Sequence, residues 1–517
     1  MAYVTHFNTS MQKNEPFLSV TDDQQKEQTR NLLKYMGLFG GVQGLNMLIS
    51  LVRNKVTAVL LGTAGVGVLA LFNSALNMLN SLTNLGVPFS TVRNLAAISQ
   101  EHDLEKTCSY VRVVRCWSIV VSLLGLVACF VLSPWLSRWS FGTDTYTSDF
   151  RWLSVAVALT TLSACELAIL KAVRQMRPII RISWMSALGS LVIVVPIYAI
   201  YGKSGIVAVL ILVAIWITVI TYAASLKVFP LQRGVLTRTS LSKGGTLIYL
   251  GIAFILAGIF GSVSDYLLRA FLVYRGSIDV AALYNAANAI LLTYMGSVFV
   301  AIDNDYFPKL SGLIQNKQAC CSLVNGQMKV AYLLIAPLLA GVLLFLPLVM
   351  PVLYSAEFSI ANVIIQYGAS YLAFKSLTLP LSYMTLAYGD SKWYLILEFG
   401  YALCFVLVMS AGYIYDSLQG LGIGLSLMGL VDFIVLVFFT RFRYDLRIFR
   451  STWMTAMKLL PLLLLSFFWS LQKPSFSYWI GGIIIFVVTV VLTVYLLSKE
   501  TDFIATLRNR NNSRPKA

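Results

Sequence analysis

Several charged residues lie within long apolar stretches of this sequence, where an ionised side chain is costly. They are Arg53, Lys55, Asp265, Arg269, Lys375 and Asp432. A charge near the centre of a membrane-spanning helix costs about 2.5–3.5 kcal/mol on insertion scales. We therefore predict that these side chains face other helices or a water-filled space, and that the cations among them bind an anion.

The four cations are predicted to hold phosphate groups of a ligand. Arg53 and Lys55 are two positions apart, about 200° around a helix, so they cannot both face one space. Arg53 is the preferred ligand residue, because its planar guanidinium fits phosphate oxygens, although Lys55 can bind phosphate as a point charge. Arg269 and Lys375 are predicted to assist.

The two acidic residues are candidates for binding a coupling ion. Asp265 lies one helical turn before Arg269, so the two either form an ion pair or act separately. Asp432 is interpreted either as a proton site or as the partner of Lys375. Both Asp265 and Asp432 are therefore predicted as ion-coupling residues, with pairing as the alternative.

An asparagine stripe is predicted on one helix. Asn73, Asn77, Asn80 and Asn84 follow spacings of four, three and four, so they share one helix face. Lipid cannot solvate amide groups, so the stripe either lines a wet space or forms hydrogen bonds between helices. We predict that Asn73 and Asn77 contact a hydroxyl-rich ligand.

The composition places the whole chain in a membrane. It has 517 residues, of which 58% are hydrophobic and only 12% charged, whereas soluble domains have about 25% charged residues. Repeated apolar runs of about 20 residues suit helices that cross about 30 Å of hydrocarbon. We predict an all-α integral membrane protein with about 14 transmembrane helices. The seven cysteines and two histidines show no metal or catalytic spacing, so we predict no catalytic residue, metal or cofactor, and no enzymatic activity.

The positive charges give the predicted orientation. Most of the 39 Lys and Arg residues fall in alternate loops on the side of both termini, which predicts that both termini are cytoplasmic. Basic loops beside anionic lipids also account for the net charge of +17, so membrane lipids are the expected partners and nucleic acid is not. Glu166 and Glu398 are predicted to lie near the cytoplasmic helix ends, within reach of water.

An internal repeat predicts the domain organisation. Residues 68–75 (VLALFNSA) resemble residues 280–287 (VAALYNAA) at a constant offset of 212, which also places Arg53 over Asp265. Six predicted helices separate the copies, which predicts two six-helix lobes related by an axis along the membrane normal, plus two C-terminal helices. The predicted order is a polar cytoplasmic segment (1–34), the N-lobe (35–226), a basic cytoplasmic loop (227–245), the C-lobe (246–440), the last two helices with their basic loop (441–498) and a basic cytoplasmic tail (499–517).

The repeat segments carry a resemblance to a known group. KVTAVLLGTAGVGVLALFNSALNMLNSLTNLGV and DYLLRAFLVYRGSIDVAALYNAANAI, followed by FPKLSGL, resemble the multidrug, oligosaccharidyl-lipid and polysaccharide exporter (MOP) superfamily, and within it the Wzx-type oligosaccharide flippases. Such flippases carry a Lys at the place of Lys55 and an Arg at the place of Arg269. The related lipid II flippases carry an Arg at the place of Arg53.

The resemblance implies a function in the bacterial inner membrane. It implies translocation of an undecaprenyl-pyrophosphate-linked oligosaccharide from the cytoplasmic to the periplasmic leaflet, for O-antigen, capsule or exopolysaccharide synthesis, with a glycan polymerase or ligase as a further partner. A cation-coupled multidrug antiporter on the same fold is the alternative. A membrane enzyme would need a sizeable outer loop, and the predicted outer loops are short.

Overall fold

The computed structural model describes residues 22–100, 103–173, 175–230, 252–314 and 316–500, and it packs them into two compact units. Unit 1 holds the described residues of Met1–Arg53, Leu79–Ser133 and Ser148–Ile252. Unit 2 holds those of Asn54–Met78, Pro134–Thr147 and Ala253–Ala517. The predicted segments 1–21, 231–251 and 501–517 lie outside the described residues.

The first half of the chain forms long apolar helices. In order they are α2 (Asp22–Thr83), α3 (Val87–Gln100), α4 (Leu104–Phe141), α5 (Thr147–Ala172), α6 (Met176–Tyr201), the 3₁₀ turn η1 (Gly202–Gly205) and α7 (Ile206–Val228). Helix α2 reverses at Gly62, whose φ of 65° and ψ of −174° are open to glycine and not to residues with a side chain. The two arms of α2 therefore count as two membrane-length segments.

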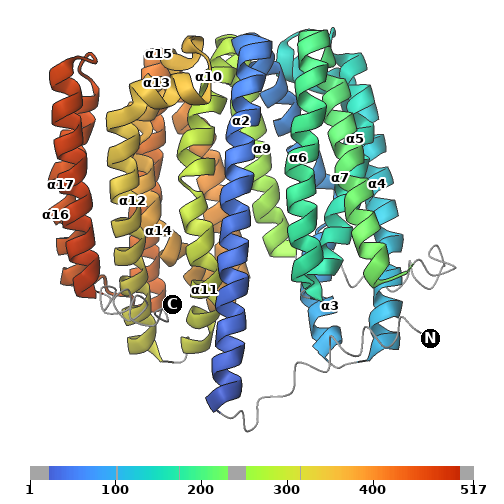
Figure 1. Ribbon diagram of the computed structural model, residues 1–517, viewed down its shortest axis with the longest axis horizontal. Coiled ribbons are helices and arrows are strands. Elements are labelled where there is room, and N and C mark those ends of the chain that lie inside the picture. Colours follow the sequence, from blue (N-terminus) through green and yellow to red (C-terminus); the bar gives the residue numbers. More distant parts are fainter. Residues whose placement is uncertain (1–21, 101–102, 174, 231–251, 315, 501–517) are drawn as a thin grey trace, which may run out of the picture. The chain divides into compact units, whose positions relative to one another are not determined.

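The second half contains more interruptions. Its elements are α9 (Ile252–Arg275), α10 (Ile278–Asn288), the π-helical turn η2 (Ala289–Tyr294), α11 (Ser297–Leu313), α12 (Lys317–Leu353), the 3₁₀ turn η3 (Ala356–Ala361), α13 (Asn362–Gly368), α14 (Ser370–Ala387), α15 (Ser391–Tyr444), α16 (Arg450–Ser470) and α17 (Phe476–Glu500). Helix α15 reverses at Asp416 and Ser417. Helices α16 and α17 pack together and against α12 (Figure 1).

The predicted helix content is confirmed. The described residues contain no strand, and nine stretches of helix are long and apolar enough to cross a membrane. This count treats the two arms of α2 as one stretch, and likewise the two arms of α15 and the pair α6 and α7. It omits the interrupted pairs α10–α11 and α13–α14. With each arm and each interrupted pair counted as one segment, the described chain has six segments before residue 231 and eight after residue 251, in agreement with about 14.

Segments of the first half of the chain pack within unit 2. Residues 54–78 surround the reversal at Gly62, and residues 134–147 join α4 to α5. Ala58 and Val66 belong to the main apolar core of unit 2, which is otherwise built from residues of the second half. The units follow packing rather than repeat symmetry, so the predicted lobe boundaries stay a prediction.

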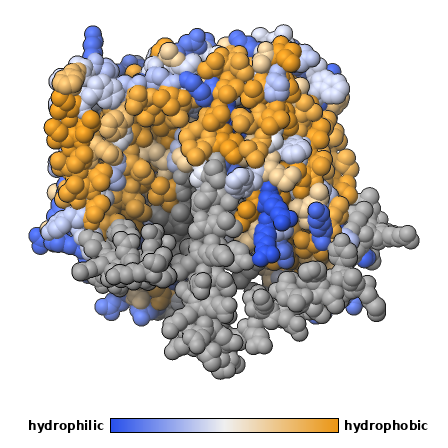
Figure 2. Space-filling view, viewed as in Figure 1, coloured by the Kyte–Doolittle hydropathy of each residue, from blue (hydrophilic) through white to orange (hydrophobic). Residues whose placement is uncertain are grey.

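The outward surfaces of unit 2 suit a lipid environment. Large apolar side chains of α16 and α17, including Leu464 and Val491, are exposed. Figure 2 shows hydrophobic residues over α12, α16 and α17. Because a face of this composition is stable in hydrocarbon and not in water, the chain is a multi-pass membrane protein.

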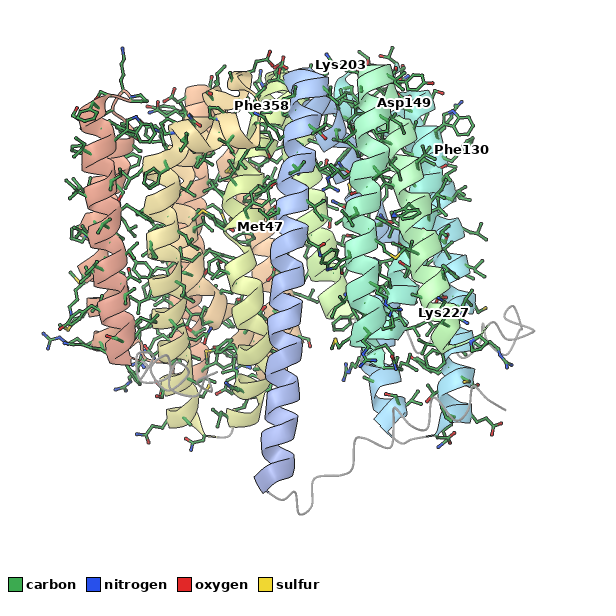
Figure 3. The ribbon with its side chains drawn as sticks, in the orientation of Figure 1. Met47, Phe130, Asp149, Lys203, Lys227 and Phe358 are labelled. Carbon is green, nitrogen blue, oxygen red and sulfur yellow. The ribbon has the colours of Figure 1, made fainter. Side chains whose placement is uncertain are left out.

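The ends of the helices in unit 1 follow the predicted alternation of loops. Asp149, at the start of α5, and Lys203, in η1, lie at one end of the unit, whereas Lys227, at the end of α7, lies toward the other (Figure 3). Asp149 follows the short link between α4 and α5, Lys203 lies in the short link between α6 and α7, and Lys227 precedes the basic segment between α7 and α9. Which end faces the cytoplasm stays a prediction.

Candidate functional site

Arg53 and Lys55 have different partners, as their two-residue spacing on α2 requires. Arg53, in unit 1, donates from Nη1 to Ser190 Oγ on α6 over 3.3 Å. Lys55, in unit 2, donates from Nζ to the carbonyl oxygens of Pro351 and Tyr354. These carbonyls lie at the C-terminal end of α12, where unpaired carbonyl groups and the helix dipole favour a cation.

The asparagine stripe on the second arm of α2 divides into two pairs. Asn73 and Asn77 are exposed, although they lie in a membrane-length segment. Asn80 instead forms hydrogen bonds with Thr160 Oγ1 and Thr161 Oγ1 of α5 at 3.0 and 2.9 Å. The alternative of bonding between helices therefore holds for Asn80, and Asn84 accepts from the backbone of the following turn. Asn73 and Asn77 keep the exposure that a ligand contact requires.

Arg269 is buried in unit 2 between α9 and α10. Its Nη1 forms an ion pair with Asp265, one turn earlier on α9, and its Nη2 donates to Asn285 Oδ1 over 3.2 Å. Its guanidinium also lies 5.6 Å from the centre of the Tyr284 ring. The Arg269 side chain is 7% exposed, whereas that of Asp265 is 36% exposed. The pairing alternative predicted for Asp265 is thus the arrangement in the structure.

One donor of Arg269 has no acceptor. Its Nε is buried and has no hydrogen-bond partner among the described residues. Buried donors are nearly always paired in proteins, so an orphan of this kind calls for a specific explanation. An oxygen-rich anion is a suitable acceptor for a guanidinium N–H.

Lys375 and Asp432 form the pair that was the second interpretation of Asp432. Lys375 Nζ on α14 lies 3.6 Å from Asp432 Oδ2 on the second arm of α15. The ammonium also lies 5.1 Å from the centre of the Tyr401 ring, on the first arm of α15. The role of Asp432 as a proton site stays a prediction.

Sequence reasoning missed one polar cluster and one member of another. Glu166 was predicted to reach water, but it is fully buried, with Oε1 2.8 Å from Arg115 Nε and Oε2 accepting from Ser225 Oγ. Arg115, the partner of Glu166, is also buried, with 4% of its surface exposed. Glu398 is partly buried, and it interacts with Lys375 and Asp432, which the sequence did not indicate. An acidic and a basic residue predicted at similar depths of different helices could have indicated both clusters.

The predicted site residues lie in both units. Arg53 belongs to unit 1, and the other predicted residues belong to unit 2. Within unit 2 the structure forms two separate ionic groups, Asp265 with Arg269 and Lys375 with Asp432, while Lys55 binds the end of α12. The role of each residue toward a ligand stays a prediction.

Comparison with known proteins shows which solved structures have a similar architecture. Similar solved structures include an inward-facing multidrug resistance MATE family transporter of the MOP superfamily, with a TM-score of 0.65 and 16% identity over 77% of this chain and 94% of that one. The lipid II flippase MurJ in an inward closed conformation has a TM-score of 0.65 and 12% identity over 90% of this chain and 99% of its own. A MOP superfamily transporter from Pyrococcus furiosus, described as having a binding pocket of reverse polarity, has a TM-score of 0.57 and 15% identity over 80% of this chain and 94% of its own.

The sequence itself gives the family. No curated protein matches it, but residues 32–313 match the family described as polysaccharide biosynthesis protein. The structural similarities, at these low identities, confirm the expected MOP fold and leave the substrate open. Because the matched segment is more than half of the 517 residues, this all-helical chain belongs to the polysaccharide biosynthesis protein family.

Proposed function

We propose that this protein is a flippase that moves an undecaprenyl-pyrophosphate-linked oligosaccharide from the cytoplasmic to the periplasmic leaflet of the bacterial inner membrane. The observation that carries the proposal is the buried guanidinium of Arg269, whose Nε has no partner among the described residues. A pyrophosphate group supplies acceptor oxygens and negative charge to such a donor. Membership of a polysaccharide biosynthesis family supports a glycan-linked cargo.

The remaining predicted residues have complementary roles. In unit 2, Arg269 holds the pyrophosphate, and Lys55 and Lys375 assist when they leave their present partners. Arg53, in unit 1, is a further predicted phosphate ligand. Exposed Asn73 and Asn77 donate to and accept from sugar hydroxyl groups. The polyprenyl tail stays in lipid, where its apolar surface needs no protein. No bond is made or broken, so the protein acts by alternating access and not as an enzyme.

The orientation follows from the charge distribution. With both termini in the cytoplasm, the basic loops face the anionic inner leaflet. An inside-negative potential then assists export of an anion by about 2.3 kcal/mol per charge per 100 mV. The product would pass to a polymerase or ligase of O-antigen, capsule or exopolysaccharide synthesis on the outer side.

A gene deletion tests the function, and one pair of variants tests the site. Deletion should cause the lipid-linked oligosaccharide to accumulate in the inner leaflet, and wild-type protein should restore glycan display. Arg269→Glu should fail to restore display although it inserts normally, while Arg275→Glu, at the exposed end of the same helix, should restore it. Arg53→Glu should behave like Arg269→Glu.

The outcomes separate the function from the site assignment. A deletion strain without precursor accumulation contradicts the flippase function. Precursor accumulation together with full rescue by Arg269→Glu and Arg53→Glu supports the function and contradicts the assigned residues.

A cation-coupled multidrug antiporter is the second candidate, and the partly exposed carboxylate of Asp265 favours it. Cationic drugs need an accessible acid, and a MATE multidrug transporter has the same fold. In that case deletion should increase drug sensitivity without precursor accumulation, and Asp265→Asn should fail to restore resistance.

A further inference from the structure

A lysine–carboxylate cluster in unit 2 contains more acid than base. We define it as Lys375 and Tyr371 on α14, Glu398 and Tyr401 on the first arm of α15, and Asp432 on the second arm. The Lys375 ammonium lies 3.6 Å from Asp432 Oδ2 and 5.1 Å from the centre of the Tyr401 ring. The hydroxyl groups of Tyr371 and Tyr401 are hydrogen-bonded over 2.9 Å.

Glu398 is the unsatisfied member of the cluster. It interacts electrostatically with both Lys375 and Asp432, but in the described part of the chain it forms no ion pair within 4 Å and no hydrogen bond. The other titratable groups that act on it or on its neighbour Lys375 are the hydroxyl groups of Tyr371, Tyr394 and Tyr401. Among the residues that the structure describes, no second cation is paired with the second carboxylate.

The charges within the cluster favour binding of one proton. With both carboxyl groups ionised, two negative charges would face one ammonium inside membrane-length helices, where an uncompensated charge is costly. Protonation of one carboxyl group removes that net charge. A metal cation would have to enter beside the ammonium of Lys375, and like charges repel strongly at short range in a poorly solvated site. The chemistry therefore selects a proton.

We propose that Glu398 carries an exchangeable proton, and that loss of this proton draws Lys375 from Asp432 toward Glu398. The ammonium then moves between the two arms of α15. On the proposed function, this exchange supplies the coupling proton of the transport cycle.

The backbone around Lys375 allows such a movement. Helix α14 follows an interruption at Ala369 and contains Pro380, so it lacks a continuous hydrogen-bond ladder on either side of Lys375. Glu398 is seven residues from the start of α15 at Ser391, about 10 Å along the helix. A proton therefore reaches Glu398 by a short path from that helix end, which is predicted to be cytoplasmic.

Infrared difference spectroscopy tests the proton site without any transported ligand. The full-length protein is placed in lipid nanodiscs, and the carbonyl stretch of protonated carboxylic acids is followed as the pH is raised. We expect wild type to lose one such band, and Glu398→Gln to lack that band. Glu357→Gln, which changes an exposed glutamate in η3, should behave as wild type.

Asp432→Asn gives a second, opposite test that does not alter Glu398. With one carboxyl group left for one ammonium, Glu398 should pair with Lys375 and be ionised at neutral pH, so its band should be absent there. A titrating band that survives in Glu398→Gln, or one that persists unchanged in Asp432→Asn, overturns the proposal. Absence of a titrating band in wild type also overturns it.

Complementation then tests the coupling role. Glu398→Gln, which mimics the protonated residue, should insert but fail to restore glycan display, whereas full rescue overturns the coupling role. Failure of the flippase function itself has a different signature, since the deletion strain would then accumulate no precursor while the infrared results would be unaffected.

Discussion

Replacing Lys55 with methionine should loosen the packing of residues 54–78 within unit 2. Lys55 joins this segment to the C-terminal end of α12 through the carbonyl oxygens of Pro351 and Tyr354. Asn54 contributes a second link, since its Nδ2 donates to Tyr294 Oη over 2.6 Å. In alternating access, these first-half residues have to leave the second-half helices when that end opens, so each link stabilises the closed arrangement.

The size of the Lys55 effect follows from the two acceptors. A hydrogen bond to a charged group contributes about 1.5–3 kcal/mol, and less where water competes. The bond to Pro351 is exposed, so we count only the partly buried bond to Tyr354. A loss of about 2 kcal/mol corresponds to about a 30-fold rise in the released population, because about 1.4 kcal/mol is a factor of ten.

Cysteine accessibility measures that population. Ala58, one turn after Lys55, is 1% exposed in the core of unit 2 and can be replaced by cysteine in a protein whose seven native cysteines have been removed. We expect a membrane-impermeant maleimide applied from outside to label Cys at position 58 about 30-fold faster in Lys55→Met. Lys203→Met, at an exposed lysine of η1 in unit 1, is the matched control and should leave the rate unchanged.

Equal labelling rates in wild type and Lys55→Met would refute this reasoning. They would mean that the contacts of Lys55 add nothing to the closed arrangement, or that residues 54–78 do not separate from unit 2. A rise in both Lys55→Met and Lys203→Met would point to general destabilisation instead, which also contradicts a specific link at the end of α12.

Three further predictions concern stability, each measured on the purified protein. Glu166→Gln leaves the buried Arg115 without its counter-ion, so the free energy of unfolding should fall by about 3–5 kcal/mol in denaturant titrations. Asn325→Ala removes an amide that bonds four partners around the link between α15 and α16, which should cost about 1–3 kcal/mol and lower the melting temperature. Arg443 lowers the pKa of Asp390 below 3.8, so this ion pair should stabilise the fold above that pH and lose its effect as the pH falls below it, a dependence that Asp390→Asn should abolish.

Each of these three predictions has a control or an outcome that would contradict it. Glu105→Gln changes an exposed glutamate and should leave stability unchanged, so a loss as large as that of Glu166→Gln would contradict the ion-pair explanation. An unchanged melting temperature in Asn325→Ala would mean that water replaces the four bonds. An acid transition that persists in Asp390→Asn would assign it to other carboxyl groups.

Much of the fold could be predicted because the membrane imposes a length and a composition on each helix. Apolar runs of about 20 residues leave little choice of secondary structure when backbone groups must be satisfied internally. The reversal at Gly62 and the interruption near Ala369 are tertiary features that average hydropathy does not report. Packing also assigns residues 54–78 to unit 2, which a repeat in the sequence could not indicate.

The candidate site was harder to predict because charge pairing depends on which helices are neighbours. Asp265 and Arg269 share one helix, so their pairing was accessible from a four-residue spacing. Arg115 and Glu166 lie on different helices, and the sequence placed Glu166 near water, whereas packing buries the two residues against each other. The place of Glu398 beside Lys375 and Asp432 depends in the same way on which helices are neighbours.

The partners of the cations imply an order in which an anionic headgroup can engage them. Lys55 is bound by neutral carbonyl oxygens, which a phosphate displaces readily because it offers the ammonium a full charge. Arg269 and Lys375 are bound by carboxylates, which compete on equal electrostatic terms. A headgroup should therefore engage Lys55 before Lys375.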